Sequence, residues 1–238
     1  IPVHLTGRIA NMNKIIEIGE KYNIPIIEDA AQAIGSKYDN RPAGSFGKVG
    51  CFSTHPLKNL NSCGDGGLLI TNDEKIYKEA ELLRSHGLES RDKSVRFGFV
   101  SRMDSIQASI LNYRLSKLDE VISVRRANAK YYFDNLNEKH IKLPIEKKHE
   151  FNTYHLFVIE VDNRDQLRHY LKENNIVTGV HYPVPIHLQP AALKLGYKKG
   201  DFPMVENQSN RILSLPVHQY LTKNNLIKIV NKINDFFS

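Results

Sequence analysis

The chain has 238 residues, of which 41% are hydrophobic and 25% charged, and its formal net charge is +7 with a pI near 9.2. This composition is typical of a globular protein with one large or two modest domains. No run of about 18 apolar residues is present, so the sequence predicts no membrane span. The basic residues are scattered and no recognisable nucleic-acid module accompanies them, so we predict no nucleic-acid partner.

The chain contains two cysteines, Cys51 and Cys63. They form neither a disulfide framework nor a metal-ligand pattern, so we expect a reducing, cytoplasmic environment. Cys51 alternates with strand residues and is expected to be a small core side chain.

In chain order, the pattern first predicts an amphipathic helix over about residues 11–22 and an apolar strand over residues 24–27, followed by Asp29. Asp29 would then lie beyond the carboxyl end of a strand, where open α/β sheets bind ligands. An aspartate followed by Ala-Ala-Gln is equally a helix start, with Asp29 as the N-cap. The two interpretations carry equal weight until the next motif is considered.

Lys58 lies in the connection between two expected buried strands, residues 49–53 and 68–71, the second of which follows a glycine-rich turn. Most lysines are solvated surface charges. A lysine held by a rigid scaffold can be partly desolvated, which lowers its pKa and frees the amine for attack. A pyridoxal phosphate (PLP) enzyme needs three kinds of group. These are an amine that binds the cofactor aldehyde, a carboxylate that pairs with the pyridinium nitrogen, and small donors that hold the phosphate. With Lys58 present, the ligand-binding interpretation of Asp29 is favoured.

Further along, helical spacing predicts helices over about residues 74–85 and 104–136, the second of them interrupted or bent. A stripe at this spacing is expected to face a core, and it comprises Gln107, Ile110, Leu111, Leu115, Leu118 and Ile122.

Residues 138–151 read as a linker. We therefore predict two domains, residues 1–137 as the C-terminal part of a large cofactor-binding domain with a long linking helix, and residues 138–238 as a small α+β domain. In the small domain, strands are expected over residues 154–161 and 176–182, and helices over 165–174, 204–213 and 224–237.

Several blocks, taken together, resemble the DegT/DnrJ/EryC1/StrS family of sugar aminotransferases. The blocks are residues 3–7, 27–33, 44–47, 52–67, 84–87, 101–104 with 107–108, and 179–189. This family has the fold-type I aspartate aminotransferase architecture. The resemblance therefore implies an α/β fold, with a partial large domain that has a mainly parallel sheet and a small α+β C-terminal domain.

The resemblance implies PLP as the cofactor and transfer of an amino group, from glutamate, to a nucleotide-linked (dTDP, UDP or GDP) keto-deoxysugar. Lys58 would bind the cofactor aldehyde and shuttle the proton between cofactor and substrate carbons. Asp29 would face the pyridine nitrogen, Gln32 would contact the ring hydroxyl and Ser53 would bind the phosphate. An intact Lys58 argues against the dehydratases of the same family, which have a histidine instead. Pathways to surface polysaccharide and to glycosylated natural products suit this activity equally.

Candidate substrate residues lie on three segments. His55 is either close enough to influence cofactor and substrate or only a loop residue, and Arg102 is either a ligand or a structural ion-pair residue. His181, Tyr182 and His187 lie on a proline-stiffened loop, which the resemblance places at the border of the nucleotide-sugar pocket. The two histidines could instead cap a strand, and no third residue has the spacing of a metal ligand, so we predict no metal site.

Two departures from the family are expected to matter. Val100 stands where the family commonly has an asparagine that reaches the phosphate of the neighbouring subunit's cofactor, and valine cannot donate a hydrogen bond. The chain also begins at Ile1, without an initiator methionine, in what is an interior strand of the family. We therefore expect a C-terminal piece of a longer protein, with part of a cofactor site and an uncovered sheet edge or face.

The resemblance further implies a homodimer with shared active sites. The rival from another class is a non-catalytic regulatory or assembly protein that retains the aminotransferase fold. Val100 and the expected absence of the family's N-terminal portion keep this rival open, and cofactor binding by the complete protein would separate the enzyme from the non-catalytic protein.

Overall fold

A computed structural model describes residues 1–238 and shows two compact units. The first comprises residues 1–123 and 146–155, and the second residues 124–145 and 156–238. Helix α4 (Leu118–Asn135) contributes to both. The predicted domain boundary near residue 137 stays a prediction, and the two units are described one at a time.

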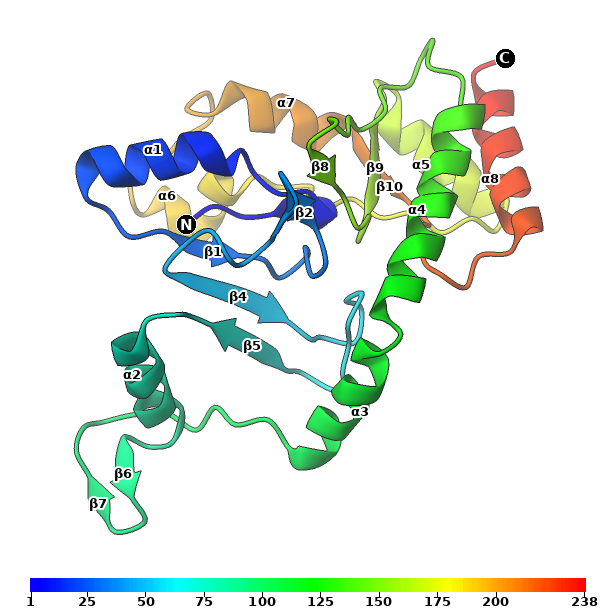
Figure 1. Ribbon diagram of the computed structural model, residues 1–238. Coiled ribbons are helices and arrows are strands. Elements are labelled where there is room, and N and C mark those ends of the chain that lie inside the picture. Colours follow the sequence, from blue (N-terminus) through cyan, green and yellow to red (C-terminus); the bar gives the residue numbers. More distant parts are fainter. The chain divides into compact units, whose positions relative to one another are not determined.

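The first unit contains η1, α1, α2 and α3 and three small sheets (Figure 1). The helices are η1 (Leu5–Gly7), α1 (Met12–Tyr22), α2 (Glu74–Arg84) and α3 (Ser105–Leu115), and the strands are β1 (Ile27–Asp29), β2 (Lys37–Tyr38), β3 (Arg41–Pro42), β4 (Val49–Ser53), β5 (Gly67–Ile70), β6 (Leu88–Ser90), β7 (Lys93–Ser94) and β8 (Glu150–Phe151).

Strands β1, β4 and β5 lie side by side in that order and form the sheet that carries the candidate site. β1 runs parallel to β4, with Asp29 opposite Cys51, and β4 runs antiparallel to β5, with Ser53 opposite Gly67. Asp29 and Ser53 are the last residues of two neighbouring parallel strands. Their side chains therefore lie at the same edge of the sheet, as the sequence predicted for Asp29.

The start of the chain packs against residues of this sheet. Asn11 caps α1 by accepting a hydrogen bond from the backbone N–H of Lys14 at 3.3 Å, and Met12, fully buried, packs with Ile9 and Ala30. No helix follows Asp29, because residues 31–35 form turns. The alternative interpretation of Asp29 as a helix N-cap is therefore wrong.

The expectation that β5 is buried is wrong. Leu68, Leu69 and Ile70 are 42%, 49% and 44% exposed, because β5 is the edge strand and pairs with β4 alone. Three consecutive apolar side chains are thus accessible on both faces of the strand. The expected uncovered edge is confirmed.

The predicted interruption of the long helix is confirmed and lies at residues 116–117, between α3 and α4. Leu111, Leu118 and Ile122 are buried together with Leu60, as the stripe predicted. Leu115 is 54% exposed, so its assignment to the core is wrong.

The second unit pairs a two-stranded antiparallel sheet with helices (Figure 1). Its elements are β9 (Phe157–Glu160), α5 (Arg164–Glu173), η2 (Ile186–Leu188), α6 (Pro190–Leu193), α7 (Pro203–Arg211), β10 (Ile212–Leu215) and α8 (Lys223–Phe236).

The helices expected after residue 154 are confirmed within a few residues at their ends, but one expected strand is missing and one strand was not expected. Residues 176–182 form no regular strand, only a bridge between Gly179 and Ser214. The helix expected to reach residue 213 ends at Arg211, where β10 begins and pairs with β9, Leu213 lying opposite Ile159. Long-range pairing with β9 decides this segment, and local spacing cannot reveal it.

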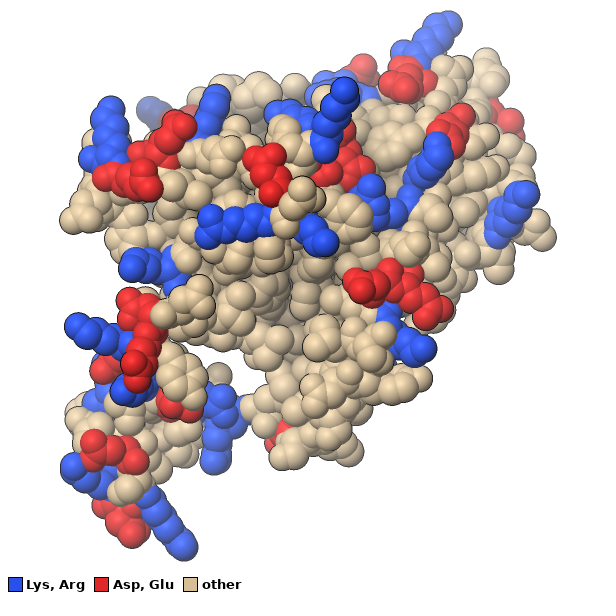
Figure 2. All heavy atoms as spheres, viewed as in Figure 1, with Lys and Arg blue, Asp and Glu red and all other residues tan.

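Lysines and arginines are interspersed with acidic residues over the face in Figure 2, as expected for solvated charges. None of the helices combines the length and apolar character that a membrane span requires.

Candidate active site

Asp29 ends β1 with one carboxylate oxygen held by the protein. Its Oδ1 accepts a hydrogen bond from the backbone N–H of Ala31 at 3.1 Å, whereas Oδ2 accepts none. The backbone is fixed on both sides, because Asp29 donates to Pro2 O and accepts from His4 N, each at 2.9 Å. The carboxylate is thus anchored at one oxygen and open to a further donor at the other.

Lys58 lies half-buried in the loop after β4. Burial lowers the pKa of its ammonium below the ordinary value of 10.5, and the nearby charge of Asp29 opposes this shift without cancelling it. The structure therefore brings Lys58 within electrostatic reach of Asp29. This confirms the expectation of a partly desolvated lysine with a lowered pKa.

The loop that carries Lys58 is closed by its own backbone. Thr54 N donates to Gly66 O at 2.9 Å and Ser62 N donates to Thr54 O at 2.7 Å. A Cβ at Gly66 would lie 2.5 Å from Thr54 Oγ1, so only glycine fits there. The glycines of this turn thus serve close packing against the end of β4, in addition to any approach to a ligand.

Asn59, next to Lys58, is buried, with 8% of its surface exposed. Its Nδ2 donates to Thr153 O at 3.3 Å, while Oδ1 accepts no hydrogen bond from the protein. A buried acceptor without a donor is costly. The immediate surroundings of Lys58 therefore still offer an acceptor to a donor group.

Ser53 is half-buried at the end of β4, and its Oγ accepts a hydrogen bond from His55 N at 3.3 Å. Gln32 is oriented by Thr6, whose backbone N–H donates to Gln32 Oε1 at 2.7 Å. With the carbonyl oxygen engaged, the donor end of the Gln32 amide is Nε2. Asp29, Gln32, Ser53 and Lys58 all belong to the first unit.

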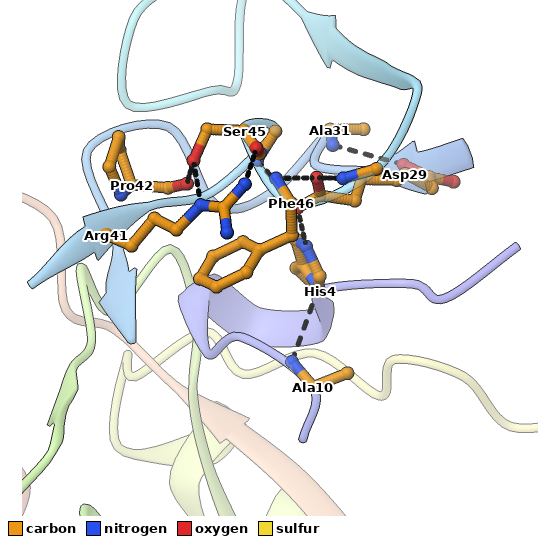
Figure 3. A network of polar contacts seen from close by, with 11 residues as sticks. His4, Ala10, Asp29, Ala31, Arg41, Pro42, Ser45 and Phe46 are labelled. Carbon is orange, nitrogen blue, oxygen red and sulfur yellow. Dashed lines mark hydrogen bonds and ion pairs between the residues drawn. The ribbon is translucent and has the colours of Figure 1, made fainter. Parts of the chain in front are cut away.

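His4 and Glu28 form a buried pair beneath Asp29. Both side chains are fully buried, and His4 Nε2 lies 2.8 Å from Glu28 Oε2. His4 Nδ1 accepts from Ala10 N at 3.3 Å, which places the ring proton on Nε2, and Figure 3 shows His4 between Ala10 and Phe46.

The Glu28 carboxylate holds the loop after β3 as well. It accepts hydrogen bonds from the backbone N–H groups of Gly44 at 2.8 Å and of Phe46 and Gly47 at 2.6 Å each. Burial raises the pKa of Glu28, but the hydrogen bonds from His4 and the loop outweigh it and leave the pKa below its ordinary value. Both residues fall within the family-like blocks 3–7 and 27–33, and no role was predicted for either. A charged residue inside an apolar strand was the signal that could have revealed the pair.

His55 and Arg102 differ in their surroundings. His55 is exposed, its Nδ1 accepts from Leu57 N at 3.2 Å and its carbonyl oxygen accepts from Lys58 N at 2.9 Å, so it shapes the turn that precedes the lysine. Arg102 is exposed and forms no ion pair within the chain. Contacts of either residue with cofactor or substrate stay predictions.

The other candidate substrate residues belong to the second unit. His181 is half-buried, with Nδ1 2.9 Å from Ser214 Oγ, and burial lowers its pKa. Tyr182 is 56% exposed. His187 is 5% exposed, and its Nε2 lies 2.9 Å from Glu206 Oε1. No group of three His, Cys, Asp or Glu side chains is arranged to hold a metal ion.

Comparison with known proteins adds to this geometry. The sequence profile of the DegT/DnrJ/EryC1/StrS aminotransferase family matches residues 1–234. The chain belongs to this family.

Three known proteins illustrate the similarity. A pleiotropic regulatory protein of Geobacillus stearothermophilus is 38% identical over all of this chain and 64% of its own length. A dTDP-3-amino-3,4,6-trideoxy-alpha-D-glucose transaminase of Streptomyces venezuelae is 34% identical over 99% of this chain and 62% of its own. The crystal structure of DesV from S. venezuelae, in complex with a ketimine intermediate, superposes with a TM-score of 0.94 at 34% identity, covering 98% of this chain and 63% of that one.

This DegT/DnrJ/EryC1/StrS chain therefore has the fold-type I architecture that the sequence predicted. It spans 61 to 66% of the length of six curated relatives that it matches.

Proposed function

We propose that the full-length protein is a PLP-dependent aminotransferase that moves an amino group, from glutamate, to the keto group of a nucleotide-linked sugar. The observation that carries the proposal is the half-buried Lys58, whose pKa is lowered by burial, within electrostatic reach of Asp29 at the carboxyl edge of β1 and β4. An amine and a carboxylate in this relation suit a cofactor that has both an aldehyde and a basic ring nitrogen.

The residues present fit PLP. The open oxygen of Asp29 would accept a hydrogen bond from the protonated ring nitrogen, Ser53 Oγ would donate a hydrogen bond to the phosphate and Gln32 would contact the ring hydroxyl. Lys58 Nζ would hold the aldehyde carbon.

In the proposed reaction, bound PLP supplies an aldehyde that condenses with amines and a ring that takes up an electron pair. Lys58 Nζ acts first as the nucleophile and later as the group that carries a proton, and its lowered pKa raises the neutral fraction that both roles need. Asp29, fixed through Ala31 and the backbone of residues 2–4, keeps a negative charge at a set position.

The substrate class is supported by the dTDP-sugar transaminase among the relatives, which is 34% identical over nearly the whole chain. His55, Arg102, His181, Tyr182 and His187 are the candidates for substrate contacts. We further propose a homodimer with shared active sites and, from the two free thiols, a reducing cytoplasmic location.

A non-catalytic regulatory role is the second candidate, because one relative carries the name of a pleiotropic regulatory protein. The lowered pKa of Lys58 and the open oxygen of Asp29 favour the enzyme. A regulator would need neither feature.

The proposal is tested by the visible absorbance of the full-length protein incubated with PLP, with Lys58→Ala as the control. We expect a cofactor band that requires Lys58 and bleaches when glutamate is added. A well-folded wild-type protein without a Lys58-dependent band would overturn the proposal and favour the regulatory role. A Lys58-dependent band that no amino donor bleaches would retain cofactor binding and overturn the transaminase activity.

A further inference from the structure

We infer that Arg114 is a positioning residue for Lys58, acting through Asn61. The inference rests on the proposed function, in which Lys58 is the reacting lysine. Arg114 lies on α3, 56 residues beyond Lys58 in the sequence, and no motif considered above assigns it a role.

Asn61 closes the loop that carries Lys58. Its Nδ2 donates a hydrogen bond to Pro56 O at 2.8 Å, which links the two ends of the six-residue segment 56–61. Inside this segment, Lys58 N donates to His55 O at 2.9 Å. Lys58 thus sits in a small closed loop whose side-chain cross-link is the Asn61 amide.

Arg114 fixes which way that amide faces. Its Nη1 donates to Asn61 O at 2.8 Å, forms a short hydrogen bond with Asn61 Oδ1 and makes a longer one, 3.4 Å, with Ser62 O. An amide can present either its oxygen or its nitrogen to a neighbour, and a guanidinium, which only donates hydrogen bonds, pairs with the oxygen. With Oδ1 held by Arg114, Nδ2 is the end that bonds Pro56.

The rest of the same face of α3 also holds this loop. Gln107 Oε1 accepts a hydrogen bond from Cys63 N at 2.8 Å, and Leu111 is buried with Leu60. Gln107, Leu111 and Arg114 are spaced by four and three residues, which aligns them on one side of a helix. A regular helix is therefore the scaffold on which the loop of Lys58 is mounted.

The effect of Arg114 is geometric. The hydrogen bonds of Arg114 go to Asn61 and Ser62 and none goes to Lys58, so Arg114 acts on the loop and not on the amine itself. Removing Arg114 should therefore leave the pKa of Lys58 unchanged and give its amine more freedom of position. If Arg114 acted instead through its charge, its removal would shift the pKa of Lys58 and leave the position of the amine unchanged. The two effects can therefore be told apart.

The test uses the full-length protein with Arg114→Met, which removes the donors, and Asn61→Asp, which keeps the acceptors for Arg114 and removes the donor to Pro56. Arg168→Met, at an exposed arginine of α5, is the matched control. Three quantities are measured: hydrogen exchange of the loop amides, the rate and pH midpoint of Lys58 acetylation, and the rate at which the Lys58-dependent PLP band forms.

We expect both variants to form the band about tenfold more slowly, the loss expected for one hydrogen bond, and the double variant to be no slower than either. Loop amides should exchange faster while β4 amides do not change, and in Arg114→Met the midpoint of Lys58 acetylation should stay at the wild-type value. Arg114→Lys should recover part of the rate, because an ammonium can replace one of the two donor contacts to Asn61.

The inference is overturned if folded Arg114→Met forms the band at the wild-type rate, if Asn61→Asp has no effect on that rate, or if the acetylation midpoint of Arg114→Met moves along with its rate. Should Arg114→Met fail to fold, Asn61→Asp and Arg114→Lys decide the matter. If the wild-type protein itself forms no Lys58-dependent band, the proposed function fails, while exchange and acetylation still test the positioning of Lys58.

Discussion

His4 Nε2 donates a hydrogen bond to Glu28 Oε2 over 2.8 Å, between two side chains that are both fully buried. His4 also donates its backbone N–H to Asp29 O at 2.9 Å. One residue near the start of the chain thus contacts both members of the Glu28-Asp29 pair at the end of β1. The buried charge of Glu28 is stabilised by four donors, and it holds the strand end from which Asp29 projects.

Glu28→Gln should lower the free energy of unfolding by about 3 kcal/mol, because an amide cannot accept all the hydrogen bonds that His4 and the backbone of residues 44–47 donate. Urea unfolding followed by circular dichroism measures this. Glu17→Gln, at an exposed position of α1, is the control and should change stability by less than about 0.5 kcal/mol. Equal stability of the two variants would show that the buried pair contributes nothing.

The same carboxylate predicts a dependence on pH. The pKa of Glu28 is lower in the folded chain than its ordinary value of 4.5, so its contribution to stability is complete above pH 4.5 and is lost as the pH falls through the folded pKa. Unfolding measured between pH 3 and pH 7 (about the range in which carboxylates titrate) should show a shallower acid dependence for Glu28→Gln than for the wild type. Parallel curves would contradict the prediction.

Asp29→Asn should lower the pKa of Lys58 further. Burial already lowers that pKa, and the negative charge of Asp29 acts against the shift by stabilising the ammonium. Competitive acetylation read by mass spectrometry over a range of pH gives the midpoint, with exposed Lys14 of α1 as the reference for reagent concentration. A midpoint that rises in the variant would have the wrong sign.

Val100→Asn should strengthen PLP binding by up to about tenfold, since it restores a donor at the position where the family commonly has one. Val100 is 64% exposed, so the change introduces no buried polar group. The dissociation constant of the full-length protein for PLP measures the effect, and Val95→Asn, 46% exposed in the wild type, is the control. A gain in both variants alike would point to a general effect of surface polarity.

Glu206→Gln should release the loop at residues 198–202 in the second unit. Glu206 accepts hydrogen bonds from His187 Nε2 at 2.9 Å, from Gly200 N at 2.8 Å and from Phe202 N at 3.3 Å. The hydrogen bond from His187 lowers the pKa of Glu206. The hydrogen bonds between Glu206 and the loop should therefore be complete when the pH is above the ordinary carboxyl pKa, and should weaken as the pH falls through the pKa that Glu206 has in the folded chain. Hydrogen exchange of residues 198–202 reports the release, and unchanged exchange would show that the pair does not restrain the loop.

Local sequence patterns were sufficient where one element or one motif decides the outcome. The position of Asp29 at the carboxyl end of a strand, the lysine in a loop after β4 and the break in the long helix could all be predicted, because period, turn residues and chain order are local properties. The strand itself was expected over residues 24–27 and lies at Ile27–Asp29. The exposure of β5 and the pairing of β10 with β9 could not, because each depends on which distant strands are neighbours.

The sequence by itself determined the chemistry of the candidate site, since an amine, a carboxylate, a hydroxyl and an amide are fixed by residue type at Lys58, Asp29, Ser53 and Gln32. Only the tertiary structure decided how these groups are held and charged. The pKa of Lys58 depends on its burial and on the charge of Asp29. The supports from Arg114 to the Lys58 loop join residues more than 50 positions apart. Burial and long-range hydrogen bonds exist only once the chain has folded, and no local pattern records them.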